Sequence, residues 1–370
     1  MTGVQREAAL ALEDGSVFVG EAFGALTDVA AEIVFNTGIT GYQEVATDPS
    51  YRGQMVVMTH PQIGNYGVSD SGDESVRPWV SALIVRELAA MPHHWESRAS
   101  LDEFLRVWNV PGLQGIDTRA LVRRLRDSGT QRGVLRQATN AAGFSPAELD
   151  VLRAAARQAP SVSQLDLVTG VSAVLPLANS QDEIAVLDCG AKWNILRSLE
   201  RRGVQPRVFA WNTSAEEILE HRPKGILISN GPGDPVMIPT VVNELKTLVQ
   251  SGTPVMGICL GHQVLGLAAG ATTNRLLYGH HGGNHPVHDL ASGRVTITTQ
   301  NHEFQVVADT IPSASGFEVS HVNLNDGSVE GLRHRELPVF SVQYHPEGCP
   351  GPQDSQRLFD DFLELAGIGQ

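Results

Sequence analysis

The sequence predicts an α/β fold for its second half and a separate α+β domain for its first half, on three observations. From about residue 184, short apolar runs alternate regularly with amphipathic stretches. A Gly-x-Cys-x-Gly turn around Cys259 joins one apolar run directly to a helical pattern. The chain has 370 residues and its first 150 lack this alternation, so two domains are expected.

The strands predicted in the second half are short, apolar and separated by helices. The first helix carries Trp193, Leu196 and Leu199 on one stripe and ends at Gly203. Such alternation indicates a doubly wound, mostly parallel sheet, whose active site lies at the carboxyl ends of the strands. We expect strands at residues 184–188, 207–210, 225–229, 254–258 and 339–344, and helices at 192–202, 216–220, 241–249 and 263–269.

The first half is less regular and is predicted to be an α+β domain. Strand-like runs at residues 8–12 and 16–19 are joined by a Glu-Asp-Gly turn, and helical patterns follow at 101–107 and 118–126. Residues 151–182 lack strong periodicity. The predicted organisation is therefore an N-terminal domain at 1–150, a connecting segment at 151–182 and a second domain at 183–370.

Charge and composition narrow the classes of partner. The formal net charge of −14 at pH 7 argues against nucleic acid or an anionic membrane surface as the main partner. Four arginines fall between Arg119 and Arg126, and we interpret them as the solvated face of a helix. The hydrophobic content of 42% and charged content of 18% are typical of soluble globular proteins.

Localisation is predicted to be cytoplasmic. No apolar run reaches membrane-spanning length, and residues 1–7 show no hydrophobic region of a signal peptide. The three cysteines, Cys189, Cys259 and Cys349, are odd in number and far apart, so a disulfide framework is not expected. A reducing compartment also suits a working thiol.

Cys259 is the candidate nucleophile. It lies between a predicted strand and a predicted helix with glycines on both sides, which is the nucleophile-elbow arrangement with cysteine in place of serine. The glycines allow a sharp turn, and the N-terminus of the following helix favours the thiolate form. A buried structural cysteine is the alternative, and the paired glycines argue against it.

His345 and Glu347 are the candidate base and its orienting group. They follow the strand predicted at residues 339–344, and Pro346 ends that strand. A thiolate nucleophile needs a base, and a carboxylate two residues beyond a histidine can fix its tautomer and orientation.

Acyl chemistry also needs N–H donors for the developing oxyanion. We assign these to Gly231, in an Asn-Gly-Pro-Gly turn, and to Leu260, the residue after the nucleophile. The alternative for the turn is an ordinary β-turn. A phosphate-binding loop is disfavoured because neither Gly-Lys-Ser/Thr nor Gly-x-Gly-x-x-Gly occurs here.

Four histidines fall within nine residues at 280–288, which raises the question of zinc. No cysteine or carboxylate stands at ligand spacing within this stretch, and its glycines and proline indicate a shaped loop. We predict that the chain holds no metal.

These motifs resemble those of the class I, triad-type glutamine amidotransferases. Further stretches resemble the family of carbamoyl-phosphate synthetase small chains, including its N-terminal domain, so the resemblance covers nearly the whole chain. The elbow alone is shared by many amidotransferases, whereas the first-half stretches are specific to this family. The similar stretches are residues 35–38, 40–44, 47–51, 115–119, 279–287 and 300–304.

The resemblance implies a glutaminase. Cys259 would attack the side-chain amide of L-glutamine, and His345, oriented by Glu347, would transfer protons through a γ-glutamyl thioester. Ammonia would pass through a channel to a large chain that binds ATP and magnesium and makes carbamoyl phosphate from bicarbonate. This chain would bind no cofactor itself and would form a heterodimer or higher oligomer. Its product would serve arginine or pyrimidine synthesis, or both.

Glutamine-binding positions follow from the same resemblance, motif by motif. Glu303 stands where the family often has glycine, and Gly38 where serine is common. A left-handed backbone at Glu303 would cost on the order of 1 kcal/mol. His262, beside the elbow, is interpreted as structural. The implied glutamine-binding residues are Ser50, Gly231, Gly233, Leu260, Gln263, Asn301, Glu303 and Phe304.

Three other functions were considered. An amidotransferase subunit of another synthetase, such as the anthranilate or aminodeoxychorismate type, would usually lack residues 1–150. A stand-alone thiol hydrolase would turn over fully without a partner. A non-catalytic scaffold would have no reason to retain Cys259, His345 and Glu347 together.

Overall fold

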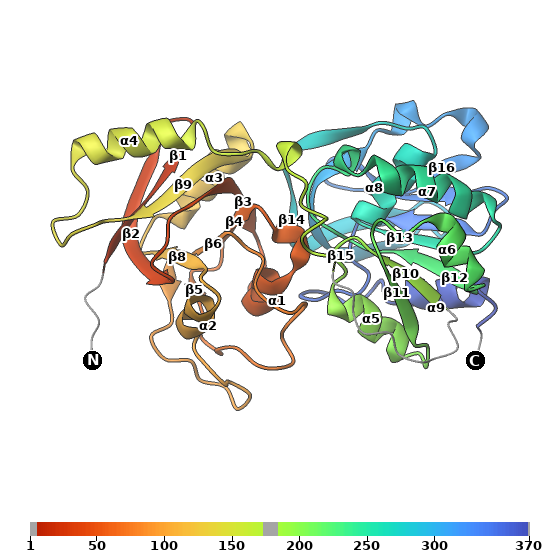
Figure 1. Ribbon diagram of the computed structural model, residues 1–370, viewed down its shortest axis with the longest axis horizontal. Coiled ribbons are helices and arrows are strands. Elements are labelled where there is room, and N and C mark those ends of the chain that lie inside the picture. The colour runs from red at the N-terminus through yellow and green to blue at the C-terminus, as the bar shows by residue number, and fades with distance from the viewer. Residues whose placement is uncertain (1–5, 173–183, 369–370) are drawn as a thin grey trace. The chain divides into compact units, whose positions relative to one another are not determined.

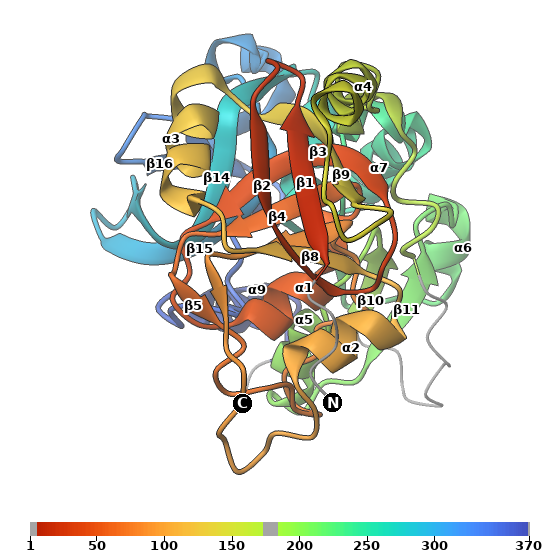
Figure 2. The same ribbon diagram turned by 90° about the vertical axis from the view of Figure 1, so that its left-hand side faces the viewer.

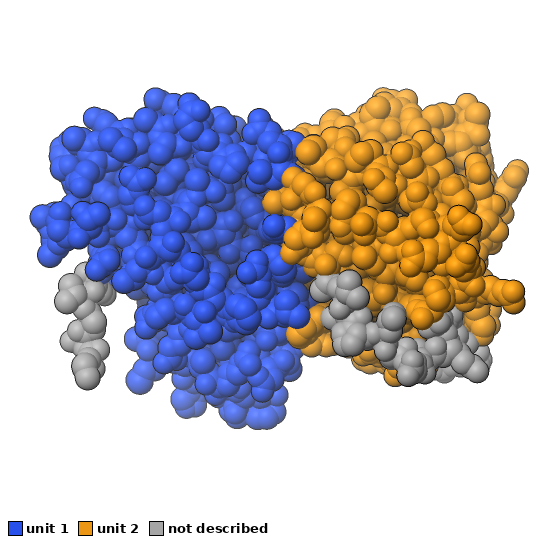
Figure 3. Space-filling view, viewed as in Figure 1, with its two compact units in different colours: residues 1–165 blue, residues 166–370 orange. Residues whose placement is uncertain are grey.

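The computed structural model describes residues 6–172 and 184–368 (Figure 1). The chain divides into two compact units, Met1–Leu165 and Asp166–Gln370, coloured separately in Figure 3. The division falls inside the predicted connecting segment, part of which (173–182) lies outside the described residues. Helix α4 (Pro146–Ala156) crosses the predicted limit at residue 150, and the predicted domain limits stay predictions.

Unit 1 is built on a closed β-barrel with the strand order β1-β2-β8-β6-β4-β3-β9, in which β9 returns to pair with β1. Antiparallel pairs join β1, β2, β8, β9 and β3, whereas β3, β4, β6 and β8 pair in parallel. The barrel strands are β1 (Glu7–Leu12), β2 (Val17–Gly24), β3 (Val29–Asn36), β4 (Gln54–Met58), β6 (Ala82–Ile84), β8 (Pro111–Gln114) and β9 (Gln131–Gln137). A small parallel pair is formed by β5 (Gln62–Ile63) and β7 (Glu87–Leu88).

The helices of unit 1 pack outside the barrel strands (Figure 2). Two of them begin with capping boxes, in which Ser100 pairs with Glu103 and Ser145 with Glu148, so their first free N–H groups are satisfied. The helices are α1 (Tyr42–Thr47), α2 (Leu101–Val107), α3 (Thr118–Ser128) and α4, with short 3-10 turns η1 (Pro49–Tyr51) and η2 (Val162–Gln164).

Unit 2 contains one mixed sheet with the order β11-β10-β12-β13-β18-β17-β16-β14-β15. Its first part is the parallel, doubly wound sheet that the sequence predicts, with β10 between β11 and β12. Strand β18 pairs in parallel with β13, so residues far apart in the chain meet at one sheet edge. The parallel strands are β10 (Ile184–Asp188), β11 (Pro206–Ala210), β12 (Gly225–Ile228), β13 (Val255–Ile258) and β18 (Val339–Val342).

The other part of the sheet is antiparallel and was not foreseen from the sequence. Strands β14 and β15 pair over most of their length with two register shifts, between Arg275 and His280 and between Gly282 and His285. The histidine-rich stretch 280–288 is therefore a strand with bulges and not a loop, which corrects our interpretation. The antiparallel strands are β14 (Thr273–Asp289), β15 (Val295–Val306), β16 (Phe317–Asn323) and β17 (Val329–His334).

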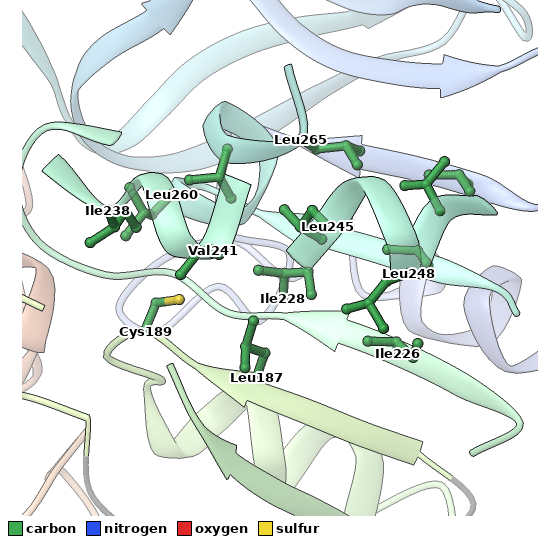
Figure 4. Packing of buried hydrophobic residues seen from close by; sticks show 14 of the residues in the cluster. Leu187, Cys189, Ile226, Ile228, Ile238, Val241, Leu245, Leu248, Leu260 and Leu265 are labelled. Atoms are coloured by element: carbon green, nitrogen blue, oxygen red, sulfur yellow. The ribbon is translucent and has the colours of Figure 1, made fainter. Parts of the chain in front are cut away.

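Helices cover the parallel part of the sheet and bury its apolar side chains. Leu245 and Leu248 of α7 and Leu265 of α8 pack with Ile226 and Ile228 of β12 in one cluster (Figure 4). This packing holds the start of α8, and with it Cys259, against the sheet. The helices are α5 (Trp193–Glu200), α6 (Ala215–Glu220), α7 (Pro239–Gln250), α8 (Leu260–Ala268) and α9 (Arg357–Leu365), with 3-10 turns η3 (Pro235–Met237), η4 (Ala308–Thr310) and η5 (Ser313–Ser315).

The predicted elements of the second half agree with the observed ones to within a few residues. Among the residues described, no helix is long and apolar enough to cross a membrane.

Candidate active site

Cys259 stands in the turn between β13 and α8 with backbone angles φ 55° and ψ −104°. A positive φ is rare for a residue with a side chain, and it persists only where the surrounding structure stabilises the strained backbone. The Cys259 N–H donates to Val342 O at 2.9 Å, which ties the turn to β18. Gly261 must be glycine because a Cβ there would lie 2.3 Å from Ile228 O. The sheet therefore fixes the direction in which the cysteine side chain leaves the turn.

The thiol of Cys259 is buried, with 2% of the residue exposed. Its Sγ lies 3.6 Å from the carbonyl oxygen of Asn301 on β15. Helix α8 begins at the next residue, so its positive end faces the sulfur and favours a negative charge there.

His345 and Glu347 follow the end of β18, the parallel neighbour of β13. His345 Nδ1 is 2.7 Å from Glu347 Oε1, and both side chains are fully buried. The His345 N–H donates to Thr299 O at 2.9 Å, which fixes the backbone. The other ring nitrogen, Nε2, is buried and has no hydrogen-bond partner within the described part of the chain. It is thus left available for proton transfer.

Lys192 completes this chain of contacts, and our sequence analysis missed it. Its Nζ lies 2.7 Å from Glu347 Oε1 and donates to Cys349 O at 2.9 Å, with only 1% of the side chain exposed. The available signal was its position just after β10, at the same carboxyl edge of the sheet as Cys259. We had assigned Lys192 only to the start of a helix.

The charge of Glu347 is held by its neighbours. Burial alone would raise the pKa of this carboxyl, but the adjacent Lys192 ammonium and His345 lower its pKa to about 2. Glu347 is therefore a carboxylate at neutral pH and keeps a hydrogen on Nδ1 of His345.

The two predicted oxyanion donors both follow carboxyl ends of parallel strands, Gly231 after β12 and Leu260 at the start of α8 after β13. Gly231 follows β12 and packs so closely that a Cβ would lie 2.2 Å from Cys189 O and 2.8 Å from Leu260 Cδ2. Neither Gly231 nor Leu260 donates its N–H to another group of the described residues. Gly233, in the same turn as Gly231, has φ +90°, which favours glycine.

Three further predicted pocket residues lie around the elbow. Gln263, one turn into α8, donates its Nε2 to Phe304 O at 2.9 Å and to Gln343 Oε1 at 3.2 Å. Asn301 Oδ1 is 3.1 Å from His281 Nδ1. Helix α8 is thus tied to β15, and Asn301 and Phe304 are both buried.

Glu303 points to Arg275 on β14, with which it forms an ion pair, and it is 5% exposed. Its backbone is not left-handed, so glutamate brings no strain of that kind at this position. The Arg275 guanidinium also lies over the Phe304 ring, 5.8 Å from its centre. The structure thus gives the Glu303 side chain a partner, and its contact with substrate stays a prediction.

Ser50 lies in unit 1, in η1, where its N–H donates to Asp48 Oδ1 at 2.9 Å. It is 8% exposed. Because the other predicted pocket residues belong to unit 2, its role in glutamine binding stays a prediction.

His262, on α8, has the structural environment that we expected for it. Its Nδ1 lies 2.9 Å from Ser341 Oγ, and complete burial lowers its pKa to about 3. It is therefore neutral and bridges α8 to β18.

His280, His302 and Glu330 offer ligand atoms within 4.8 Å of one another. Both ring nitrogens of His302 are hydrogen-bonded, at 2.8 and 2.9 Å, and both Glu330 oxygens accept amide groups, at 2.7 and 3.0 Å. Burial alone would lower the pKa of His280, but Asp326 and Glu330 raise it to about 9. A proton on His280 thus compensates the negative charges of Asp326 and Glu330. The prediction that the chain holds no metal stays a prediction. Sequence spacing missed Glu330 because it comes from β17.

Two family comparisons agree with this geometry. Residues 185–365 match the family "Glutamine amidotransferase class-I", which covers nearly all of unit 2. Residues 10–135 match "Carbamoyl-phosphate synthase small chain, CPSase domain", which covers most of unit 1. Unit 2 is therefore a class I glutamine amidotransferase domain, as its elbow and sheet predict.

Individual relatives identify the family across the whole chain. The "Carbamoyl phosphate synthase small chain" of Symbiobacterium thermophilum is 49% identical over 96% of this chain and 97% of the relative. That of Bacillus caldolyticus is 46% identical over 96% and 95%. The "Carbamoyl phosphate synthase pyrimidine-specific small chain" of Bacillus subtilis is 44% identical over 96% and 95%. The chain belongs to the carbamoyl phosphate synthase small chain family, and the predicted family, fold class and enzyme class are confirmed.

Replacing Lys192 by methionine should destabilise unit 2 by about 3–5 kcal/mol, because Glu347 is left as a buried charge without its cation. The variant Lys192→Met/Glu347→Gln should recover most of this loss, since both buried charges are gone. Urea unfolding of the wild type, both single variants and the double variant measures the coupling. A double variant no more stable than Lys192→Met would contradict this account.

The same pair sets an expected pH dependence. The folded pKa of Glu347 lies below its usual 4.5, so its stabilising effect is present above pH 4.5 and is lost as pH falls toward 2. In Lys192→Met this loss over the same window should be smaller. Unchanged acid sensitivity in the variant would show that Lys192 is not the main cause.

Proposed function

We propose that this chain hydrolyses L-glutamine through a Cys259 thioester and supplies the ammonia to a large synthetase chain. The observation that supports the proposal most is the state of His345. Its Nδ1 is held at 2.7 Å from Glu347, while its buried Nε2 has no partner in the described part of the chain. An imidazole held in this way can accept a proton at Nε2 and return it.

In the first step, the Cys259 sulfur bonds to the side-chain amide carbon of glutamine while the thiol proton moves to His345 Nε2. The carbonyl oxygen becomes negative, and the free N–H groups of Gly231 and Leu260 can donate to it. These donors are fixed by the turn after β12 and by the first residue of α8, so they need no reorganisation as charge develops.

In the second step, the carbon–nitrogen bond breaks and His345 gives its proton to the departing nitrogen, which leaves as ammonia. The γ-glutamyl group remains on the sulfur as a thioester. Water then adds to the thioester carbon while His345 takes one of its protons. The carbon–sulfur bond breaks as His345 returns this proton to the sulfur, which releases glutamate and restores the Cys259 thiol.

Lys192 is a positioning residue in this scheme. It holds Glu347 charged and in place, and Glu347 Oε1 in turn orients the His345 ring through Nδ1. The Nε2 lone pair can then face the thiol. Loss of Lys192 should therefore lower kcat through the orientation of His345.

The partner and pathway extend the proposal beyond this chain. Relatives are named small chains, so we infer a large chain as the partner, in a heterodimer or higher oligomer, which would bind ATP and magnesium. We propose that ammonia is channelled to it for carbamoyl phosphate synthesis in the cytoplasm. The pyrimidine-specific relative supports pyrimidine synthesis as a use of the product, beside arginine synthesis.

Glutamate release by the purified chain should be slow alone and strongly stimulated by a family large chain with ATP, magnesium and bicarbonate. The physical reason is that a subunit supplying ammonia should hydrolyse glutamine only when the acceptor is ready. Glutamate and carbamoyl phosphate are measured together. Equally fast turnover with and without the partner would instead indicate a stand-alone thiol hydrolase.

Cys259→Ser should lower the rate of glutamine-dependent synthesis by the complex by on the order of 10³-fold or more, which is the scale of activity lost when an enzyme loses its nucleophile. Ammonia-dependent synthesis should persist, because the large chain would not need the thiol. Cys189→Ser is the matched control, since Cys189 is buried in the same unit but makes no part of the proposed chemistry. Loss of both activities in Cys259→Ser would refute the division of labour.

Ser50→Ala should mainly raise KM for glutamine, by about tenfold for one lost hydrogen bond to a charged group, with kcat less affected. Ser69→Ala serves as a control in the same unit. Steady-state glutaminase kinetics of the complex give both constants. An unchanged KM would remove unit 1 from the glutamine pocket.

A further inference from the structure

Two stretches that resemble the family, residues 35–38 and 115–119, have no part in the proposed glutamine chemistry, yet they meet in unit 1. Strands β3 and β4 are parallel neighbours, and Asn36 pairs with Met58 at their ends. Thr37 and Thr59 directly follow these ends, and the Thr59 N–H donates to Asn36 O at 3.0 Å. The two threonines thus stand side by side at the carboxyl ends of these two parallel strands.

Helix α3 supplies the other side of this edge. It begins at Thr118 and packs on β3 and β4 with Leu121 and Leu125 buried. Residues 119, 123 and 126 are spaced by four and three positions, so their arginine side chains share one face of the helix. These arginines are exposed, which confirms the predicted solvated face, and the same face also borders the threonines.

A cavity of about 480 Å³ lies between these groups. It carries positive charge and hydroxyl groups, and no carboxylate lines it in the described part of unit 1. Its lining residues are Thr37, Thr59, Thr118, Arg119, Val122, Arg123 and Arg126.

Two of the guanidinium groups are not neutralised. Arg126 pairs with Asp127 at 2.7 Å, and the nearby Asp117 is used as the N-cap of α3, accepting from the Ala120 N–H. Arg119 and Arg123 make no ion pair or hydrogen bond within the described residues. Two free arginines in one cavity stand out in a chain whose formal net charge is −14.

We propose that this cavity binds a phosphate group, either as the free ion or as part of a small phosphorylated molecule. Arginine guanidinium groups match phosphate oxygens with paired N–H donors, and threonine hydroxyls can donate to the remaining oxygens. The cavity is larger than one phosphate ion, so it has room for the rest of a small molecule. The inference is independent of the glutamine reaction, because it concerns unit 1 alone.

The test measures binding of inorganic phosphate and of ADP without magnesium to the full chain by isothermal titration calorimetry, at constant ionic strength set with chloride. The variant Arg119→Gln/Arg123→Gln should weaken binding by about tenfold or more, since charge-assisted hydrogen bonds are lost. Arg124→Gln is the matched control. Arg124 lies on the same helix but pairs with Asp14 at 2.7 Å and does not line the cavity.

The outcomes separate the sources of the phosphate. Equal affinity for both probes indicates that the free ion is sufficient, and tighter binding of ADP indicates a phosphorylated small molecule. Both support the site if the double variant loses binding and Arg124→Gln retains it. No binding of either probe, or equal binding by the double variant, overturns the proposal. If phosphate fails to bind and the double variant instead loses affinity for the large chain, the face would be a docking surface for an acidic protein segment.

Discussion

The buried pair of Lys192 and Glu347 is the interaction on which the arrangement of unit 2 depends most. The two residues follow different strands, β10 and β18, so their contact joins the carboxyl ends of two strands that are not neighbours in the sheet. Each charge would be costly to bury alone, and Glu347 Oε1 contacts both the Lys192 ammonium and the His345 ring. The cost of separating them explains why His345 can be fully buried and still be held in one orientation. In the proposed reaction, the thiol would therefore depend on a lysine that does not touch the substrate.

Strand register carries the same constraint through the backbone. Ile258 lies opposite Val342, and the Cys259 N–H donates to Val342 O. The position of Cys259 is therefore fixed relative to β18, the strand that precedes His345. A slip of one residue would turn every side chain of β18 to the other face of the sheet. The apolar packing of α7 and α8 on β12 resists such a slip. The hydrophobic core and the reaction geometry are therefore stabilised by the same contacts.

Local patterns in the sequence were enough to predict the parallel strands, the helices between them and the turn at Cys259. They were not enough for the barrel of unit 1 or for strands β14 to β17, because those strands are stabilised by partners distant in sequence. The histidine stretch was misread for this reason: its pairing with β15 overrides the glycines and proline that suggest a loop. Lys192 and Glu330 were missed because their partners, Glu347 and His280, come from other strands, and a spacing rule sees only neighbours along the chain.

Strand β15 stands at the end of its sheet, and this has a consequence for how the protein can vary. One row of its backbone groups is left for neighbours other than a strand, and the carbonyls of Thr299 and Asn301 in that row accept from the His345 N–H and lie against Cys259 Sγ. Contacts made by main-chain atoms do not depend on which side chain the residue carries. A glutamate at position 303 can therefore replace a glycine without altering that row, and its carboxylate can turn to Arg275 instead. Side-chain substitutions along this edge therefore leave in place the main-chain groups that lie against Cys259 and His345.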